Sequence, residues 1–173
     1  MIEKIKPIRL IAFDVDGIMT DGGLYLTDSG EEFKRFHSLD GHGLKMLKAS
    51  GVELAIITGR TSRCVEMRAK NLGITHVYQG IHKKWDAMQD LLNKLQLAPE
   101  VAAFMGDDVV DLPAMRRAGF SVTVPKAPPI VHQYANYTTK HEGGNGAVRE
   151  VCELIMSAQG TLSAQLAPYL GDD

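Results

Sequence analysis

Five short apolar runs recur along this chain, and stretches with helical periodicity lie between them. The runs span residues 8–13, 52–57, 76–78, 101–105 and 120–124. Their nearly continuous apolar character is typical of strands that are buried on both faces of a sheet. Apolar residues at helical spacing occupy positions 85, 88, 92 and 95, and positions 148, 151, 152 and 155. Strands that alternate with helices predict a mainly parallel sheet between two helical layers, a Rossmann-like three-layer α/β sandwich.

Capping residues mark the starts of two earlier helices. Asp40 is a candidate cap for a helix near 43–49. Thr61 or Ser62 is a candidate cap for a second helix, which extends to about Leu72.

One segment breaks the alternation of strands and helices. Residues 22–26 and 32–36 flank Thr27-Asp28-Ser29-Gly30, a sequence typical of a hairpin turn. No linker or internal repeat divides the chain. We therefore expect a single domain over residues 1–158, with the hairpin inserted at 22–36.

Residues 159–173 carry no strong helix signal and indicate a C-terminal tail. Leucines at positions 162, 166 and 170 favour docking of this tail against the domain. Two readings of Gly143 to Gly146, just before the last helix, stay open. They give either a flexible approach, which would let the tail gate a site, or an ordinary helix start with Asn145 as its cap.

Composition and charge exclude several classes of protein. Of the 173 residues, 45% are hydrophobic and 23% are charged, as in globular domains. Nineteen Lys and Arg residues face 21 Asp and Glu residues, a formal charge of −2, which gives no electrostatic basis for a nucleic-acid partner. No run approaches the ~20 apolar residues of a membrane span, and the first residues show no export signal. With two cysteines only, we expect a reduced, cytoplasmic chain without a membrane partner.

Reactive residues follow four of the predicted strands. In chain order these are Asp14 and Asp16, Thr58 with Gly59 and Arg60, Lys83 and Lys84, and Asp107, Asp108 and Asp111. Ligands of open α/β sheets bind outside the carboxyl ends of the strands. Several carboxylates at one edge repel one another unless a cation joins them, and carboxylate oxygens are ligands that Mg²⁺ prefers. With Asp14 and Asp107 as ligands, and with Thr58 and Lys84 as a donor and a cation, the set predicts a Mg²⁺-dependent phosphoryl-transfer site.

The spacing of Asp14 and Asp16 suggests two roles. They are two residues apart, so their side chains point to the same side of an extended strand end. One carboxylate can attack phosphorus and form an aspartyl-phosphate. The other can protonate the leaving oxygen and then deprotonate the attacking water. We assign the nucleophile to Asp14 and the acid/base to Asp16. Each motif alone is also compatible with an Asx turn or a helix cap, but their combination favours catalysis.

The motifs are similar to those of a known superfamily. Asp14-Val-Asp-Gly-Ile-Met-Thr20, Thr58-Gly-Arg60, Lys84 and Gly106-Asp-Asp-Val-Val-Asp111 resemble the four motifs of the haloacid dehalogenase superfamily of phosphatases. The resemblance covers residues 8–124. It implies that Mg²⁺ is held by the carboxylates of Asp14 and Asp107 and by the main-chain carbonyl of Asp16. It also implies that Thr58 and Lys84 hold the phosphoryl group, with Lys83 as the alternative to Lys84.

A narrower resemblance extends to about residue 158. Phe36-His-Ser-Leu-Asp40-Gly-His-Gly-Leu-Lys45, Asp111-Leu-Pro113 and Gly143-Gly-Asn-Gly-Ala-Val-Arg-Glu150 are similar to segments of superfamily members that dephosphorylate an eight-carbon sugar acid in bacterial lipopolysaccharide synthesis. The substrate contacts that it implies are Asp16, His37, Ser38, Leu39, Asp40, Gly41, Lys45, Gly59, Arg60, Arg68 and Lys84. Arg can bind the carboxylate of such a sugar in bidentate fashion. A nine-carbon sialic-type sugar acid phosphate is the alternative substrate.

The gaps between the motifs leave no room for the cap domain of larger superfamily members. We expect the hairpin at 22–36 to stand in its place, and its unpaired edges favour assembly through it. The resemblance implies a homotetramer, and we expect residues from two subunits to build each pocket. The alternative from another class is a phospho-accepting receiver module, which hydrolyses its aspartyl-phosphate slowly. Asp16, two residues after the nucleophile, disfavours that alternative.

Overall fold

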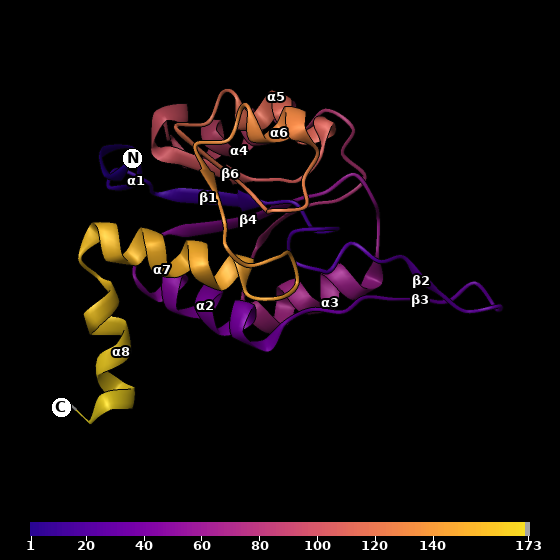
Figure 1. Cartoon of the computed structure of the whole chain (residues 1–173), viewed down its shortest axis with the longest axis horizontal. Helices are drawn as coiled ribbons and strands as arrows, with labels where there is room; N and C mark the ends of the chain where they lie inside the picture. The colour runs from indigo at the N-terminus through magenta and orange to yellow at the C-terminus, as the bar shows by residue number, and fades with distance from the viewer. Residues whose placement is uncertain (172–173) are drawn as a thin grey trace.

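The computed structural model describes residues 1–171 and has an α/β fold built on one large sheet (Figure 1). Six strands pair in parallel in the order β5-β4-β1-β6-β7-β8. Their bounds are β1 Leu10–Phe13, β4 Glu53–Ile57, β5 His76–Tyr78, β6 Ala102–Met105, β7 Phe120–Thr123 and β8 Tyr137–Thr138. The five predicted strands are confirmed. β8 was not predicted, because two residues are too short to show a strand pattern.

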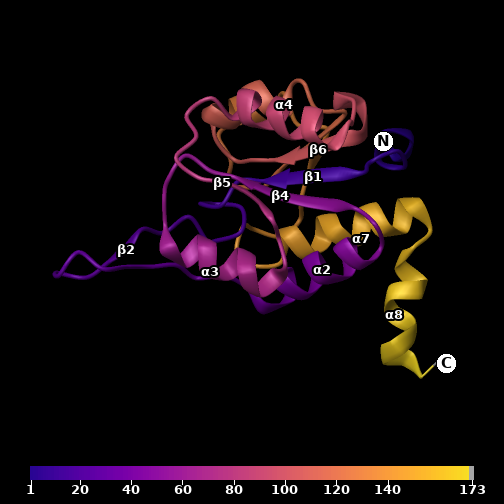
Figure 2. The same ribbon diagram turned by 180° about the vertical axis from the view of Figure 1, so that it is seen from behind.

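Helices cover both faces of this sheet, which confirms the three-layer sandwich (Figures 1 and 2). One layer contains α2 (Ser38–Ala49), α3 (Arg63–Leu72) and α7 (Ala147–Gln159). The other contains α4 (Lys84–Leu95), α5 (Leu112–Met115) and α6 (Pro129–His132). The remaining short elements are α1 (Ile2–Ile5) and the 3₁₀ turns η1 (Pro99–Val101) and η2 (Val109–Asp111). Within residues 1–171, no helix combines the length and the apolar composition that a bilayer span requires.

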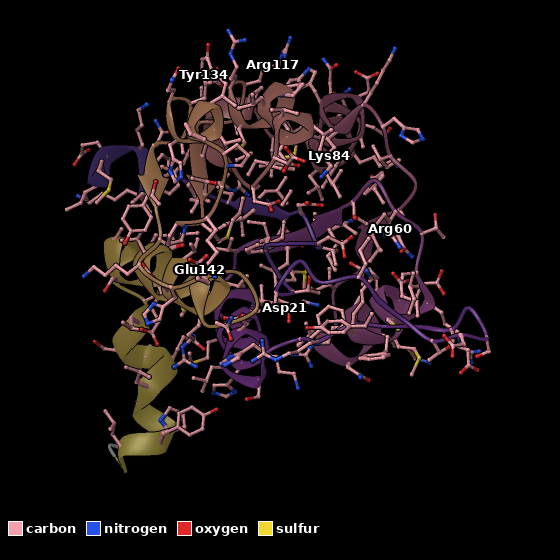
Figure 3. All side chains as sticks on the ribbon, turned by 45° about the vertical axis from the view of Figure 1, so that its right-hand side comes forward. Asp21, Arg60, Lys84, Arg117, Tyr134 and Glu142 are labelled. Atoms are coloured by element: carbon pink, nitrogen blue, oxygen red, sulfur yellow. The ribbon has the colours of Figure 1, made fainter. Side chains whose placement is uncertain are left out.

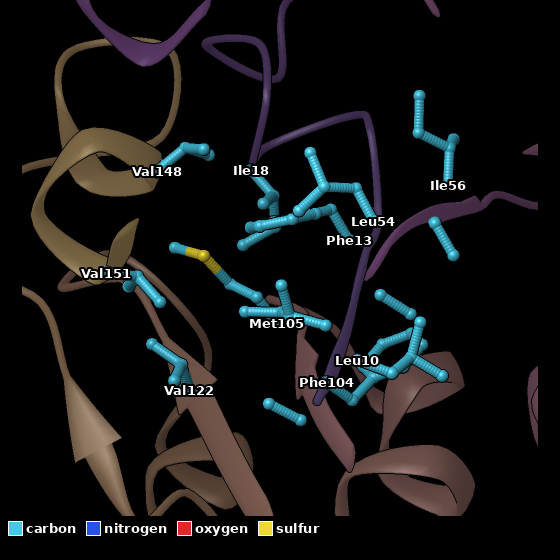
Figure 4. Close-up of a cluster of buried hydrophobic side chains, with 14 of the residues drawn as sticks. Leu10, Phe13, Ile18, Leu54, Ile56, Phe104, Met105, Val122, Val148 and Val151 are labelled. Carbon is cyan, nitrogen blue, oxygen red and sulfur yellow. The ribbon is translucent and has the colours of Figure 1, made fainter. Parts of the chain in front are cut away.

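The hydrophobic core lies on both faces of the central strands (Figure 4). Phe13, Phe104 and Phe120 are fully buried there. Met105 of β6 reaches toward α7, where Val151 is buried as the helical spacing predicted. Each such side chain stabilises the fold by roughly 1.5–3 kcal/mol relative to its exposed state. The central strands are therefore the firmest support that the fold offers for a site at their ends.

The direction in which strands are added reverses between β1 and β6. From β1 the chain continues to β4 and β5 on one side of the sheet, and then to β6, β7 and β8 on the other. Phe13 pairs in register with both Ile56 and Met105, so the carboxyl ends of these three strands are level. Ligands of open α/β sheets bind at such a switch point. The loops after β1 and β6 lie side by side at this point.

The predicted hairpin is confirmed and forms an arm, residues 22–36, that extends from the body (Figures 1 and 2). Its strands are β2 (Tyr25–Leu26) and β3 (Glu32–Phe33), which pair antiparallel. The rings of Tyr25 and Phe33 stack with their centroids 4.9 Å apart. Leu24, Leu26 and Phe33 are each more than half exposed. The arm thus presents apolar side chains that this chain alone leaves in contact with solvent.

The prediction of a C-terminal tail without helix was wrong. After Gly160 the chain forms α8 (Leu162–Leu170), which projects from the body (Figure 1). Leu162 and Leu166 pack against the core, as expected for a docked segment, whereas Leu170 is exposed. Pro168 inside the helix and the preceding glycine concealed its helical pattern. Positions 172–173 of the predicted tail lie outside the described residues.

The prediction that Asp40 caps its own helix was also wrong. α2 begins at Ser38 with His37 as N-cap, so Asp40 lies in its first turn. The carboxylate of Asp40 instead accepts a hydrogen bond from the backbone N–H of Arg149, at 2.9 Å, in the first turn of α7. Asp40 thereby joins two helices that are far apart in the sequence.

The start of α7 follows neither of the two forms that the sequence left open. Its N-cap is Gly146, not Asn145. No side chain of the described residues, that of Asn145 included, makes a cap hydrogen bond to this helix start. Gly143 and Gly144 are packed against the backbone of the loop after β1, and a Cβ on either would collide with Gly17 or with Thr20 and Asp21. The glycines therefore serve close packing here, and the segment is not a flexible approach.

Candidate active site

A pocket of about 280 Å³ opens at the carboxyl ends of the central strands. It is lined by Asp14, Asp16, Thr58, Gly59, Arg60, Ile81, His82, Lys84, Asp107, Asp108 and Val110. Figure 3 shows Lys84 and Arg60 at this end of the sheet. All residues that the sequence predicted to act on the phosphoryl group or to hold the metal therefore meet in one place. Ile81, His82 and Val110 were not predicted, because apolar and neutral wall residues carry no motif.

Local structure fixes the carboxylates of the pocket. Asp14 follows β1, and its backbone N–H donates to the carbonyl of Met105 at the end of β6, at 2.9 Å. Asp107 packs against Gly17, whose φ is +90° and whose added Cβ would lie 2.7 Å from Cγ of Asp107. Glycine is therefore needed at position 17 for two reasons, the backbone conformation and the close approach.

Three carboxylates converge in the pocket. Asp14, Asp107 and Asp111 each offer one oxygen, and these oxygens lie within 4.8 Å of one another. Asp111 is fully buried and already has partners for both oxygens. Oδ1 lies 2.5 Å from Nζ of Lys84, and Oδ2 accepts the backbone N–H groups of Asp107 and Asp108 at 3.0 and 3.1 Å. Asp111 therefore shapes the loop, and Asp14 and Asp107 are left to face a cation.

The charges of the pocket are out of balance without a cation. Burial and the neighbouring charge of Asp111 raise the pKa of Asp14 to about 6, although Lys84 acts against this. Burial, Asp14, Asp111 and Asp108 raise the pKa of Asp107 to about 7. Hard carboxylate oxygens that repel one another in a buried site suit a small divalent ion such as Mg²⁺. The residues present thus fit the predicted metal.

Lys84, and not Lys83, lies in the pocket. The side chain of Lys84 is 2% exposed, and its Nζ lies 2.8 Å from Oδ1 of Asp14. Burial opposes its charge, but the carboxylates of Asp111 and Asp14 outweigh burial and raise the pKa of Lys84. Lys83 is the exposed N-cap of α4 and does not line the pocket. An ammonium group therefore stands beside the predicted nucleophile.

Two cations lie beside the carboxylate of Asp16, and one of them is within hydrogen-bond distance. Its Oδ1 lies 2.6 Å from Nζ of Lys34, a residue of the arm, and its Oδ2 lies 3.8 Å from Nε of Arg60. Sequence reasoning did not find Lys34. The only signal was that Glu32 and Lys34, two residues apart in a strand, point to the same side. Arg60 is in the place that the sequence predicted, at the rim of the pocket.

Most of the other predicted substrate contacts lie away from this pocket. His37, Asp40, Gly41 and Arg68 line a separate small recess between α2, α3 and α7. Ser38, Leu39 and Lys45 are exposed on α2. In one chain these residues therefore do not join Asp14.

The recess has unusual polarity. Three of the buried side-chain atoms that have no hydrogen-bond partner within the described chain are Nδ1 of His37, Oδ2 of Asp40 and Nε of Arg68. Nη2 of Arg68 donates to the carbonyl of His37 at 3.2 Å, and its guanidinium lies 5.6 Å from the ring centre of Phe36. Buried polar atoms are usually paired, so unpaired ones mark places where a further partner would be stabilising.

Comparisons with known proteins agree along most of the chain. The family model for a haloacid dehalogenase-like hydrolase matches residues 36–119. The 3-deoxy-D-manno-octulosonate 8-phosphate phosphatase KdsC of Escherichia coli K12 is 49% identical over 162 residues, which are 94% of this chain and 86% of that protein.

Solved structures agree with this. The crystal structure of the same phosphatase from Moraxella catarrhalis, in complex with magnesium ion, phosphate ion and KDO, has a TM-score of 0.95 and 47% identity, with 97% of both chains covered. The cobalt-bound form of the Haemophilus influenzae phosphatase has a TM-score of 0.88 and 38% identity, with 91% of this chain and 92% of that chain covered.

Proposed function

The chain belongs to the 3-deoxy-D-manno-octulosonate 8-phosphate phosphatases among the haloacid dehalogenase-like hydrolases, and from this premise we propose that it hydrolyses that sugar acid phosphate to the free sugar acid and phosphate. It is a phosphoric monoester hydrolase that uses Mg²⁺. The observation that carries this function is the cluster of Asp14, Asp107 and Lys84 at the sheet's switch point. It occurs in a chain whose relatives match it along nearly its whole length.

The carboxylates of Asp14 and Asp107 and the main-chain carbonyl of Asp16 would hold the metal ion. When bound, Mg²⁺ neutralises charge on the phosphoryl oxygens and so makes phosphorus easier to attack. The ammonium of Lys84, 2.8 Å from Asp14, favours the ionised form of that carboxylate and would also bind a phosphoryl oxygen. Thr58 is 2% exposed and lines the pocket, where its hydroxyl would donate to another phosphoryl oxygen.

Hydrolysis would proceed in two displacements. An oxygen of Asp14 attacks phosphorus, the bond from phosphorus to the sugar oxygen breaks, and protonated Asp16 gives its proton to that oxygen. Water then attacks phosphorus, Asp16 takes a proton from it, and the bond between Asp14 and phosphorus breaks to release phosphate. Asp16 is unchanged after both steps, and one water is consumed. Because a receiver module lacks such an acid/base, the position of Asp16 at the pocket disfavours that alternative.

The remaining substrate contacts would come from a second subunit. His37, Ser38, Leu39, Asp40, Gly41, Lys45 and Arg68 do not line the pocket of their own chain. The exposed apolar side chains Leu24, Leu26 and Phe33 of the arm favour its burial against another copy. We propose a homotetramer joined through the arms, in which these residues approach the sugar in a neighbouring pocket. The unpaired atoms of His37, Asp40 and Arg68 support this arrangement.

Two further proposals concern the context of the chain. We place its activity in the cytoplasm, in the synthesis of lipopolysaccharide precursors. Residues 1–158 would form the complete hydrolase domain, with α8 as an addition to it.

The direct test is turnover on phosphorylated eight- and nine-carbon sugar acids with Mg²⁺. We expect the highest kcat/KM for 3-deoxy-D-manno-octulosonate 8-phosphate, and Asp14→Asn should fold but release no phosphate. Higher kcat/KM for the nine-carbon substrate would replace this function by the alternative.

Deletion of residues 23–34 tests the assembly. A monomer with unchanged activity and substrate preference in sedimentation and turnover assays would contradict the shared pocket.

A further inference from the structure

Four charged side chains form a closed ring at the mouth of the pocket, with signs that alternate around it. Lys34 lies 2.6 Å from Asp16 and 3.2 Å from Glu32. Arg60 lies 2.9 Å from Glu32 and 3.8 Å from Asp16. Glu32 and Lys34 belong to the arm, whereas Asp16 and Arg60 belong to the loops after β1 and β4. The ring is thus a direct polar connection between the arm and the catalytic loops.

Lys34 is the least exposed member of this ring. Its side chain is 1% exposed, whereas that of Arg60 is 46% exposed. A buried ammonium is costly unless it is paired with charge and hydrogen-bonded. Asp16 and Glu32 are the two partners that satisfy it. Because Glu32 shares the ammonium, Lys34 is held in place even while Asp16 changes its protonation state.

The two carboxylate oxygens of Asp16 have different surroundings. Oδ1 is fixed by Lys34 at a distance typical of a charge-assisted hydrogen bond. Oδ2 lies 3.8 Å from Nε of Arg60, beyond hydrogen-bond distance. Oδ2 is therefore the oxygen that is free to carry a proton to the leaving group and to take one from water.

We propose that Lys34 is a positioning residue for Asp16: the arm supplies a buried ammonium that anchors Oδ1 and so directs Oδ2 of Asp16 to the reacting oxygen. The inference rests on the proposed function, since it concerns the proton transfers of that reaction. Lys34 acts through Asp16 and needs no contact with the substrate. A general acid/base contributes about 10²–10⁴ to the rate only when it is well placed, so its loss of position should appear in kcat.

The test compares Lys34→Met with the wild type in steady-state turnover of 3-deoxy-D-manno-octulosonate 8-phosphate at saturating Mg²⁺. Met retains most of the apolar stem and removes the ammonium. We expect kcat to fall about 10–100-fold, with KM changed by less than about threefold and Mg²⁺ affinity unchanged. Lys34→Arg should restore part of kcat. Lys126→Met, which removes a lysine whose side chain is 85% exposed, is the matched control and should leave kcat unchanged.

A double-mutant cycle separates positioning from other roles. In an Asp16→Asn background, Lys34→Met should change residual kcat by less than about twofold. An equal loss in both backgrounds would overturn the proposal, and so would a rise in KM at unchanged kcat, which would make Lys34 a substrate ligand. If Lys34→Met fails to assemble like the wild type in sedimentation, Lys34→Gln gives the same test with a smaller loss of polarity. A wild-type chain without turnover would refute the function itself, whereas an active wild type with an unaffected Lys34→Met would refute this inference alone.

Discussion

Magnesium binding should depend steeply on pH between 5 and 8. The metal-free pocket holds Asp14 with a pKa of about 6 and Asp107 with a pKa of about 7, both raised first of all by burial. Each must lose its proton before it can bind a cation. Taken as independent sites, these values reduce the apparent Mg²⁺ affinity by about 10³ when the pH falls from 8 to 5. Exposed carboxylates with ordinary pKa values would produce almost no change over this range.

Isothermal titration calorimetry in buffers of different ionisation enthalpy measures both quantities. At pH 6.5 we expect about one proton to be released per Mg²⁺ bound, and at pH 8 only about a tenth of a proton. Asp28→Asn, on the exposed turn of the arm, is the control and should leave the profile unchanged. An affinity that changes less than about tenfold between pH 5 and 8 would show that the two carboxyls are already ionised in the metal-free protein. The electrostatic account of the pocket would then be refuted.

The raised pKa values of Asp14 and Asp107 also determine whether the stability of the metal-free protein rises or falls with pH. Both carboxyls have a higher pKa in the folded state than the ordinary value of 3.8, so the folded state binds protons more tightly than the unfolded state. Their contribution to stability is therefore fully present below pH 3.8, falls as the pH rises from that value, and is gone once the pH has passed about 6 for Asp14 and about 7 for Asp107. Thermal unfolding of the metal-free protein should show this loss, and saturating Mg²⁺ should remove it.

Three further outcomes test other parts of the site and fold. Asp16→Asn should give a burst of about one p-nitrophenol per active site when p-nitrophenyl phosphate is turned over in quench-flow. The p-nitrophenolate leaves without needing a proton, whereas hydrolysis of the aspartyl-phosphate still needs Asp16 as a base. A linear time course without a burst would contradict the role of Asp16. Gly17→Ala should weaken Mg²⁺ binding more than tenfold in calorimetry, because its Cβ would displace Asp107, and an unchanged Kd would argue against this packing. Glu150→Gln should lower the free energy of unfolding in urea by about 1–3 kcal/mol, since the Glu150 carboxylate accepts the hydroxyl of Tyr137 at 2.7 Å and the backbone N–H groups of Lys140 and His141. Glu3→Gln, whose side chain is 88% exposed, is the control and should leave the free energy of unfolding unchanged.

The sequence predicted the strands of the large sheet and the functional residues that directly follow them. Buried parallel strands are continuous apolar runs, and all of them end at the same edge of the sheet. Asp14, Thr58, Lys84 and Asp107 could therefore be assigned to one pocket although nearly a hundred positions separate the first from the last. The choice between Lys84 and Lys83 is decided by where α4 begins. Lys84 is its first residue and is buried, whereas Lys83 is the N-cap before it and is exposed.

Polar contacts between residues far apart in the sequence could not be predicted from local sequence patterns. Asp40 satisfies a backbone N–H of α7, 109 positions away, so its partner is set by helix packing and not by local spacing. Lys34 reaches Asp16 because the returning strand of the arm lies beside the loop after β1 at the base of the arm, where Phe36 pairs with Thr20. A lysine in a short strand has the same local pattern whether it is solvated or paired. The helical state of residues 162–170 was missed because Pro168 outweighed the spacing of Leu162 and Leu166.

The two carboxylates that face the cation extend from β1 and β6, which are neighbours inside the sheet, while β5 and β8 form its borders. Amide hydrogens of interior strands exchange only when most of a domain opens, whereas border strands fray at far lower cost. Fraying at β5 or β8 would therefore leave the spacing between Asp14 and Asp107 intact. A Mg²⁺ ion held by Asp14 and Asp107 would therefore keep its two carboxylate ligands in place while the border strands open.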